Sequence, residues 1–132
     1  TKNYDQADII LTGVSRSGKT PTCLFLALQY GIYAANYPLI DEDLDSVKLP
    51  SVLKPFKKKL YGLSINPVRL QNIRGERRSN SGYASIEQCQ KEVRRAEDMY
   101  VQNNVPWIDT SHISIEEIAG RILQKSKLER RY

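Results

Sequence analysis

The sequence is poor in the residues that cross-link small secreted folds or bind metals. It contains two cysteines and one histidine among 132 residues. Cys23 and Cys89 fall within apolar helical patterns and lack the spacing of metal ligands. We therefore expect reduced thiols packed in the core and no disulfide. His112 lies in a predicted turn, so we expect it to face solvent without a catalytic role.

Long apolar segments are also missing. No run approaches the roughly 18 apolar residues of a membrane span, and no charged-then-apolar leader opens the chain. These absences predict a cytoplasmic protein with no membrane partner. A chain of 132 residues, 40% of them hydrophobic, can bury one core, which predicts one domain over residues 1–132. Because the chain starts with Thr1 and a strand follows almost at once, we expect a piece of a longer protein.

Positive charge is in excess, with a net charge of +5. The surplus is concentrated in residues 54–59, 69–78 and 125–131, which favours anionic ligands or an acidic partner. Neither an aromatic-interleaved RNA motif nor a zinc finger accompanies these residues, so nucleic acid is not an expected partner.

The most informative motif is a phosphate-binding loop. Residues 13–20 read GVSRSGKT, fit GxxxxGK[ST] without a mismatch, and directly follow the strand-like run 8–12. Glycines allow successive N–H groups to converge on phosphate oxygens, and the following helix presents its positive end. In this motif Lys19 neutralises phosphate charge and Thr20 offers its hydroxyl to Mg²⁺. The predicted nucleotide-binding residues are Gly13, Val14, Ser15, Arg16, Ser17, Gly18, Lys19 and Thr20.

Pro21 follows the loop and has no backbone N–H to donate. One interpretation is a tolerated helix start, since N–H groups of a first turn lack intrahelical partners. The other is a weaker hold on the inner phosphate, which would suit a nucleotide bound by its outermost phosphate.

Hydrophobic periodicity predicts strands at residues 8–12, 32–37, 60–65 and 105–109. Helices are expected at 19–30, ended by Gly31, and at 67–78, capped by Asn66. Two further helices begin at the capping pairs Ser85 with Gln88 and Ser114 with Glu117. Residues 49–59 are predicted to form a loop. This alternation predicts an α/β fold, a P-loop kinase-like three-layer sandwich with a mostly parallel central sheet.

Phosphoryl transfer requires cations and carboxylates around the moving group. Arg74 and Arg77 are expected to project from a helix with a mobile end, as a basic lid over the nucleotide, although a solvated helix face is the alternative for each arginine alone. The catalytic candidates are Lys19, Asp41, Arg74 and Arg77.

A strand ending in a Walker-B aspartate is not apparent. Residues 41–45, which include Asp41, could bind metal or accept a proton, or could form an acidic surface turn. Asp109 fits a turn residue as well as a metal partner.

A family resemblance follows from these residues. The strings 8–22 and 31–39 resemble the bacterial phosphoenolpyruvate synthase regulatory protein family, related to the pyruvate, phosphate dikinase regulatory proteins. The similarity continues through 60–67, 74–78, 83–85 and 105–108 and so covers nearly the whole chain. GVSRSGKTPT is more specific than a bare phosphate-binding loop, because it adds Ser15, Arg16 and Pro21.

The resemblance implies a bifunctional cytoplasmic enzyme. Such an enzyme phosphorylates a threonine of phosphoenolpyruvate synthase, or of pyruvate, phosphate dikinase, with ADP as donor, and removes that phosphate with inorganic phosphate, releasing pyrophosphate. The synthase-directed branch is the closer one, and a homo-oligomer is possible. Family members are longer at the N-terminus, so the chain is expected to match their C-terminal half.

Two other functions stay open at this point. A small-molecule kinase of nucleoside or shikimate type would use the same loop, arginines and domain size. A nucleotide-sensing module without turnover would fit the missing Walker-B aspartate.

Overall fold

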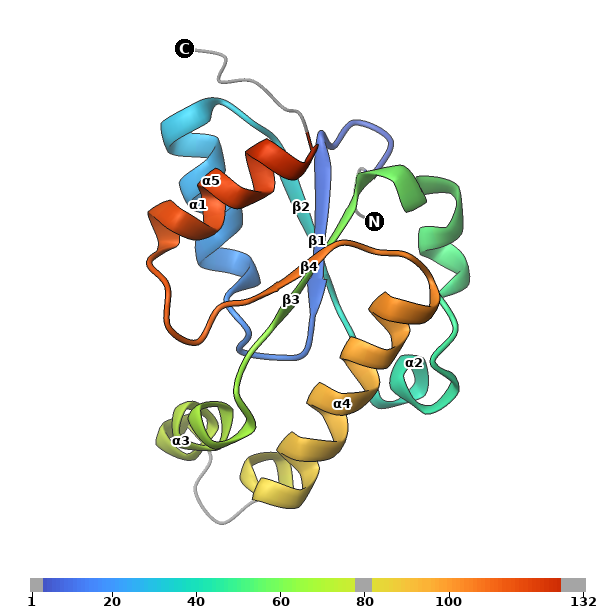
Figure 1. Ribbon diagram of the computed structural model, residues 1–132, viewed down its shortest axis with the longest axis vertical. Coiled ribbons are helices and arrows are strands. Elements are labelled where there is room, and N and C mark those ends of the chain that lie inside the picture. The colour runs from blue at the N-terminus through green and yellow to red at the C-terminus, as the bar shows by residue number, and fades with distance from the viewer. Residues whose placement is uncertain (1–3, 78–81, 127–132) are drawn as a thin grey trace.

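The computed structural model describes residues 4–77 and 82–126, and these form a three-layer α/β sandwich around one sheet (Figure 1). The strands are β1 (Ile9–Gly13), β2 (Ala34–Pro38), β3 (Leu60–Ser64) and β4 (Trp107–Asp109). They lie in the order β2-β1-β3-β4, and all their pairings are parallel. The predicted fold class is therefore confirmed, and the four strands lie close to their predicted positions.

Helices cover both faces of the sheet. In Figure 1, α1 (Lys19–Tyr30) packs beside α5 (Ile115–Ser126) on one face, and α2 (Asp41–Ser46) and α4 (Ile86–Gln102) lie on the other. Helix α3 (Pro67–Arg77) lies beyond the carboxyl ends of the strands and packs against α4. Ligands of open α/β sheets bind at this carboxyl edge.

Alternation along the strands divides the core between the two faces. Ile9 and Leu11 of β1 join the cluster under α1 and α5, whereas Ile10 joins the cluster under α4. In β3, Leu63 belongs to the first cluster and Leu60 to the second. Since successive side chains of a strand point to opposite faces, one buried strand supports two helical layers.

Helix ends follow the predicted chemistry. Gly31 ends α1 in the left-handed region with φ 66°. Asn66 Oδ1 accepts from the N–H of Val68 at 2.9 Å, and Ser114 Oγ accepts from the N–H of Glu117 at 3.1 Å. Ser85 Oγ likewise accepts from the N–H of Gln88 at 3.2 Å. These short polar side chains satisfy N–H groups that a helix start leaves unpaired.

Two segments differ from the prediction. Residues 49–59 were expected to be a loop, but 51–59 form the 3-10 segment η1 (Ser51–Lys59). The acidic stretch becomes helix α2 rather than a turn, because Asp43 Oδ2 accepts from the N–H of Ile40 at 3.1 Å and so caps the helix start. Carboxylates are favourable at that positive helix end. The predicted mobile end of α3 at 78–81 and the basic tail after 126 lie outside the described residues.

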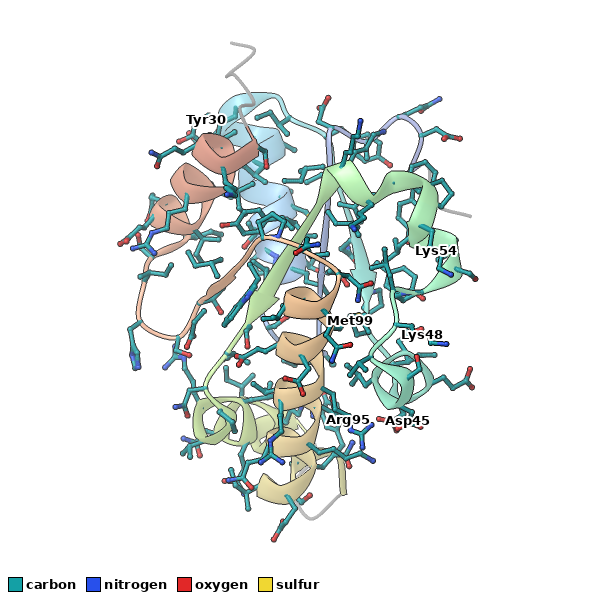
Figure 2. The ribbon with its side chains drawn as sticks, turned by 45° about the vertical axis from the view of Figure 1, so that its right-hand side comes forward. Tyr30, Asp45, Lys48, Lys54, Arg95 and Met99 are labelled. Carbon is teal, nitrogen blue, oxygen red and sulfur yellow. The ribbon has the colours of Figure 1, made fainter. Side chains whose placement is uncertain are left out.

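Helix α4 holds α2 in place. Arg95 of α4 reaches toward Asp45 of α2, with Met99 one turn further along (Figure 2). Arg95 Nη1 donates to the carbonyl oxygen of Asp45 at 3.1 Å and lies 3.9 Å from its carboxylate. Because the carboxylate is exposed, the backbone contact is the more specific restraint.

Candidate functional site

The predicted loop connects β1 to α1 in a conformation suited to anions. Arg16 has φ 73° and Gly18 has φ 101°, both in the left-handed region. Backbones of this kind form concave nests of N–H groups. Gly18 adopts this conformation without steric cost, and α1 begins at the next residue.

Loop carbonyl groups are held by specific donors. The oxygen of Val14 accepts from the N–H of Ser17 at 3.2 Å, from Ser17 Oγ at 2.8 Å and from Lys19 Nζ at 2.7 Å. Thr110 Oγ1 donates to the oxygen of Ser17 at 3.2 Å. In a planar trans peptide the C=O and N–H point in opposite directions. The amides of residues 15 and 18 therefore face away from these donors.

A cavity of about 560 Å³ opens at the loop. Most of its wall comes from the loop and the first turn of α1, and the rest comes from the end of β2 and from the short 3-10 turn η2 (Gly82–Ala84). The lining residues are Ser15, Arg16, Gly18, Lys19, Thr20, Pro21, Asn36, Pro38 and Tyr83. Of the eight predicted loop residues, five line the cavity, while Gly13, Val14 and Ser17 lie behind it.

Lys19 is buried, with 6% of its surface exposed. Its hydrogen bond to the Val14 oxygen keeps the ammonium group folded over the loop. Thr20 is exposed in the first turn of α1, next to Pro21. The cation and the hydroxyl that the motif predicts thus share one cavity.

Beneath the loop, Tyr100 of α4 ties together the strands that carry it. Its hydroxyl lies 3.1 Å from the oxygen of Thr12 in β1 and 2.9 Å from that of Leu63 in β3, and donates to these carbonyls. Complete burial raises the pKa of Tyr100 well above its usual range, so the hydroxyl keeps its proton. The ring rests on Gly62, where a Cβ would lie 2.5 Å from Tyr100 Cζ.

Arg74 was predicted to lie on an exposed, basic lid, and this prediction is wrong. Its side chain is fully buried, and its guanidinium makes two bonds to Glu92, Nη2 to Oε1 at 2.8 Å and Nη1 to Oε2 at 3.1 Å. Burial opposes the charge, but the hydrogen bonds and charge of Glu92 outweigh it and raise the pKa of Arg74. The prediction failed because the helical periodicity placed all the arginines of this helix on its solvent-facing side.

Arg74 also reaches the loop. Nη2 donates to the oxygen of Ser15 at 3.1 Å, and Nη1 donates to the oxygen of Tyr83 at 3.1 Å. The guanidinium carbon lies 4.2 Å from the centre of the Tyr83 ring, and the Tyr83 hydroxyl is 2.7 Å from Ser15 Oγ. One buried cation therefore contacts two walls of the cavity.

Of the other predicted catalytic residues, Asp41 does not line the cavity and Arg77 is described by its backbone alone. Asp41 is exposed at the start of α2 and accepts from Gln88 Nε2 at 3.4 Å, and the same Gln88 nitrogen donates to Glu92 at 2.7 Å. Asp41 is thus connected to the loop through Gln88, Glu92 and Arg74, without lining the cavity. The backbone of Arg77 ends α3, and its side chain lies outside the described part of the molecule.

Sequence reasoning did not assign Glu92, Gln88, Tyr83 or Thr110 to the site. The importance of Glu92 could have been predicted, because it lies three residues after Cys89 on the buried face of an amphipathic helix. A carboxylate on such a face needs a partner. Tyr83 and Thr110 are far from the loop in sequence, and no local pattern connects them to it.

Asp109 serves as a turn residue at the end of β4. Its Oδ1 accepts from the N–H of Ser111 at 2.8 Å and from Ser111 Oγ at 2.6 Å. Ser111 Oγ in turn accepts from the N–H of Asn66 at 2.7 Å. Among residues 4–77 and 82–126, no three His, Cys, Asp or Glu side chains are grouped as metal ligands would be.

The remaining predictions concern cysteines, histidine and membrane segments. Cys89 is buried and Cys23 half-buried, the two are not joined by a disulfide, and His112 is exposed as expected. None of the helices described is both long and apolar enough to span a bilayer.

Comparison with known proteins gives the same family as the sequence resemblance. Relatives in Neisseria gonorrhoeae and Laribacter hongkongensis are 59% and 58% identical over 131 residues, and one in Marinobacter nauticus is 55% identical over 130. Each is named "Putative phosphoenolpyruvate synthase regulatory protein".

The matches cover 98–99% of this chain but 48% of each relative. The chain thus spans about half the length of the curated relatives it matches. The matches lie in the N-terminal half of those relatives, so the expectation that the chain corresponds to their C-terminal half is wrong. A family model described as Kinase/pyrophosphorylase matches residues 1–123. Because that match covers nearly the whole chain, the protein belongs to the Kinase/pyrophosphorylase family.

Proposed function

We propose that this chain carries the nucleotide-binding site of a regulatory phosphotransferase that acts on phosphoenolpyruvate synthase. In one direction a threonine hydroxyl of the target attacks the β-phosphorus of ADP, giving phosphothreonine, AMP and a proton. In the other, inorganic phosphate attacks the phosphothreonine, giving threonine and pyrophosphate. The names of the relatives and of the family support this assignment.

The observation that carries the proposal is the preorganised loop. Val14 and Ser17 have their carbonyl oxygens held by side-chain donors, so the opposite amides are oriented before any ligand arrives. Fixed dipoles around a phosphoryl group stabilise its charge without reorganisation during the reaction. Both proposed reactions place a diphosphate in the same cavity, as ADP or as the pyrophosphate product.

Lys19 supplies the mobile charge of the site. In this structure its ammonium bonds to the Val14 oxygen at 2.7 Å, and a bound diphosphate offers it a stronger, charge-assisted partner. We therefore expect Lys19 to exchange the carbonyl oxygen for a phosphate oxygen when the cavity fills.

Mg²⁺ fits this site as an ion held mainly by the nucleotide. Magnesium keeps several waters and takes one or two protein oxygens beside the phosphates, so the absence of a carboxylate cluster among the described residues does not conflict with it. The exposed Thr20 hydroxyl at the cavity wall is the proposed protein ligand. When bound, the ion would neutralise phosphate charge.

The test is phosphothreonine formation. The full-length protein, purified phosphoenolpyruvate synthase and ADP are mixed, and the synthase is examined by mass spectrometry; inorganic phosphate is then added to measure pyrophosphate release. Lys19→Ala is expected to lower both rates by ~10²-fold or more, since one site serves both directions. Lys54→Ala is the control, because Lys54 is an exposed lysine of η1 (Figure 2) that does not line the cavity, and it should keep both activities.

Each contrary outcome has a distinct meaning. Phosphate-dependent removal that survives in Lys19→Ala would show two separate sites. No phosphothreonine with the parent protein, but phosphorylation of a small hydroxyl compound from an acceptor panel, would replace the proposal with a small-molecule kinase. Nucleotide binding without any turnover would indicate a sensor.

A further inference from the structure

Stability alone does not explain the buried ion pair Arg74–Glu92. Both Nη atoms of Arg74 are hydrogen-bonded, but its buried Nε has no partner in the part of the chain that the structure describes. Buried ion pairs often contribute less than apolar residues of the same volume, and an unpaired buried donor lowers stability further. A leucine pair between α3 and α4 would avoid both penalties.

The contacts between Arg74 and the loop indicate a different role for this pair, the orientation of a loop peptide. Arg74 Nη2 donates to the carbonyl oxygen of Ser15. The peptide between Ser15 and Arg16 is planar and trans, so its N–H points away from Arg74. Ser15 and Arg16 both line the cavity, and Arg16 has the left-handed φ of 73°. The bond to Arg74 thus selects the face of this peptide that meets the cavity.

Tyr83 is held by the same guanidinium. Its carbonyl oxygen accepts from Nη1, the guanidinium carbon lies 4.2 Å from the centre of its ring, and its hydroxyl is hydrogen-bonded to Ser15 Oγ. Glu92 fixes both Nη atoms by its two oxygens. The rigid, planar guanidinium group of arginine can donate to all these partners at once, whereas the ammonium group of lysine, on a flexible stem, cannot.

We propose that Arg74 is a positioning residue that, braced by Glu92, orients the Ser15–Arg16 peptide so that the Arg16 amide faces the phosphate cavity. Arg74, which does not line the cavity, acts in this proposal through the loop backbone rather than on the phosphoryl group as first predicted. The orientation of the amide stands on the contacts alone. Its consequence, tighter binding of a terminal phosphate, rests on the function proposed above.

The test compares two equal substitutions in the full-length protein. Arg74→Lys keeps the positive charge but loses the planar guanidinium group and its paired donors. Arg121→Lys is the matched control, since Arg121 also pairs with a glutamate, Glu117, at 2.7 Å, but on the exposed face of α5. The measurements are the backbone amide resonance of Arg16 without ligand, and calorimetric titration with inorganic pyrophosphate.

We expect Arg74→Lys to shift the Arg16 amide resonance and to weaken pyrophosphate binding about tenfold, the value of one lost hydrogen bond in this setting. Arg121→Lys should change neither. An unshifted Arg16 resonance in folded Arg74→Lys would overturn the proposal. If the parent protein does not bind pyrophosphate, the proposed function fails, while the resonance still decides whether Arg74 positions the loop.

A second variant keeps the proposal testable if Arg74→Lys does not fold. The double substitution Arg74→Leu with Glu92→Leu removes both charges together, which is often neutral or stabilising for a buried pair. A positioning role predicts a folded protein with weakened pyrophosphate binding and a shifted Arg16 amide. A folded double variant with the parent's affinity and resonance would show that the pair is only a brace between α3 and α4.

Discussion

Gly62 and Tyr100 show how closely single residues fit beneath the loop. A Cβ at position 62 would lie 2.5 to 2.7 Å from three atoms of the Tyr100 ring, and that ring is fixed by its burial and by its bonds to the Thr12 and Leu63 carbonyls. Gly62→Ala is therefore expected to lower the free energy of unfolding by ~1–3 kcal/mol. Urea denaturation measures the change.

The control for this prediction is a glycine in open space. A Cβ at Gly120 meets no atom within 4 Å, and the residue is exposed in the middle of α5. Gly120→Ala should raise the free energy of unfolding by roughly 0.5–1 kcal/mol, since alanine has the higher helix propensity. Equal effects of the two substitutions would argue against the close contact at Gly62.

At the scale of elements, Asn66 determines where α3 begins. Its Oδ1 accepts from the N–H groups of Val68 at 2.9 Å and of Arg69 at 3.3 Å. Asn66→Ala is expected to lower the free energy of unfolding by about 1 kcal/mol, whereas Asn66→Asp keeps the cap and should stay close to the parent. Thermal unfolding of the two variants checks this, and an Asn66→Ala variant as stable as the parent would mean that the cap contributes nothing.

Elements with strong local signals could be predicted from the sequence. Helix α1 begins and ends at the predicted residues, Lys19 and Tyr30, because a phosphate-loop motif precedes it and Gly31 terminates it. Segment η1 was missed, because Pro50 and Pro55 are typical of loops, and a 3-10 helix has no strong periodic signal. Helix α2 was missed because its cap is the side chain of Asp43 at the third helical position, within a run of acids.

Candidate site residues were predictable only where the motif is contiguous. Residues 13–20 could be read directly, and five of them line the cavity. Arg74 was identified, but its burial was not, because that depends on Glu92 and on the approach of α4 to α3. Long-range contacts of this kind arise from tertiary packing, which a residue pattern does not encode locally.

At the scale of the whole molecule, one sheet belongs to both cores. Ile9 and Leu11 contribute to one cluster and Ile10 to the other, so neither helical layer keeps its packing if β1 is lost. We expect one cooperative unfolding transition. Trp107, the single tryptophan, lies in β4 with its ring centroid 6.1 Å from that of Tyr100. Its fluorescence and far-UV circular dichroism should give the same urea midpoint, and separate midpoints would contradict the shared core.

The tether between Thr110 and Ser17 has a consequence for synthesis of the protein. The loop leaves the ribosome before the partners that hold it: Arg74 and Thr110 bond to its backbone, and Tyr83 bonds to the Ser15 side chain. A nascent chain that has not yet released residue 110 has the motif without its supports. We therefore expect the loop to reach its anion-binding conformation only after residue 110 has left the ribosome.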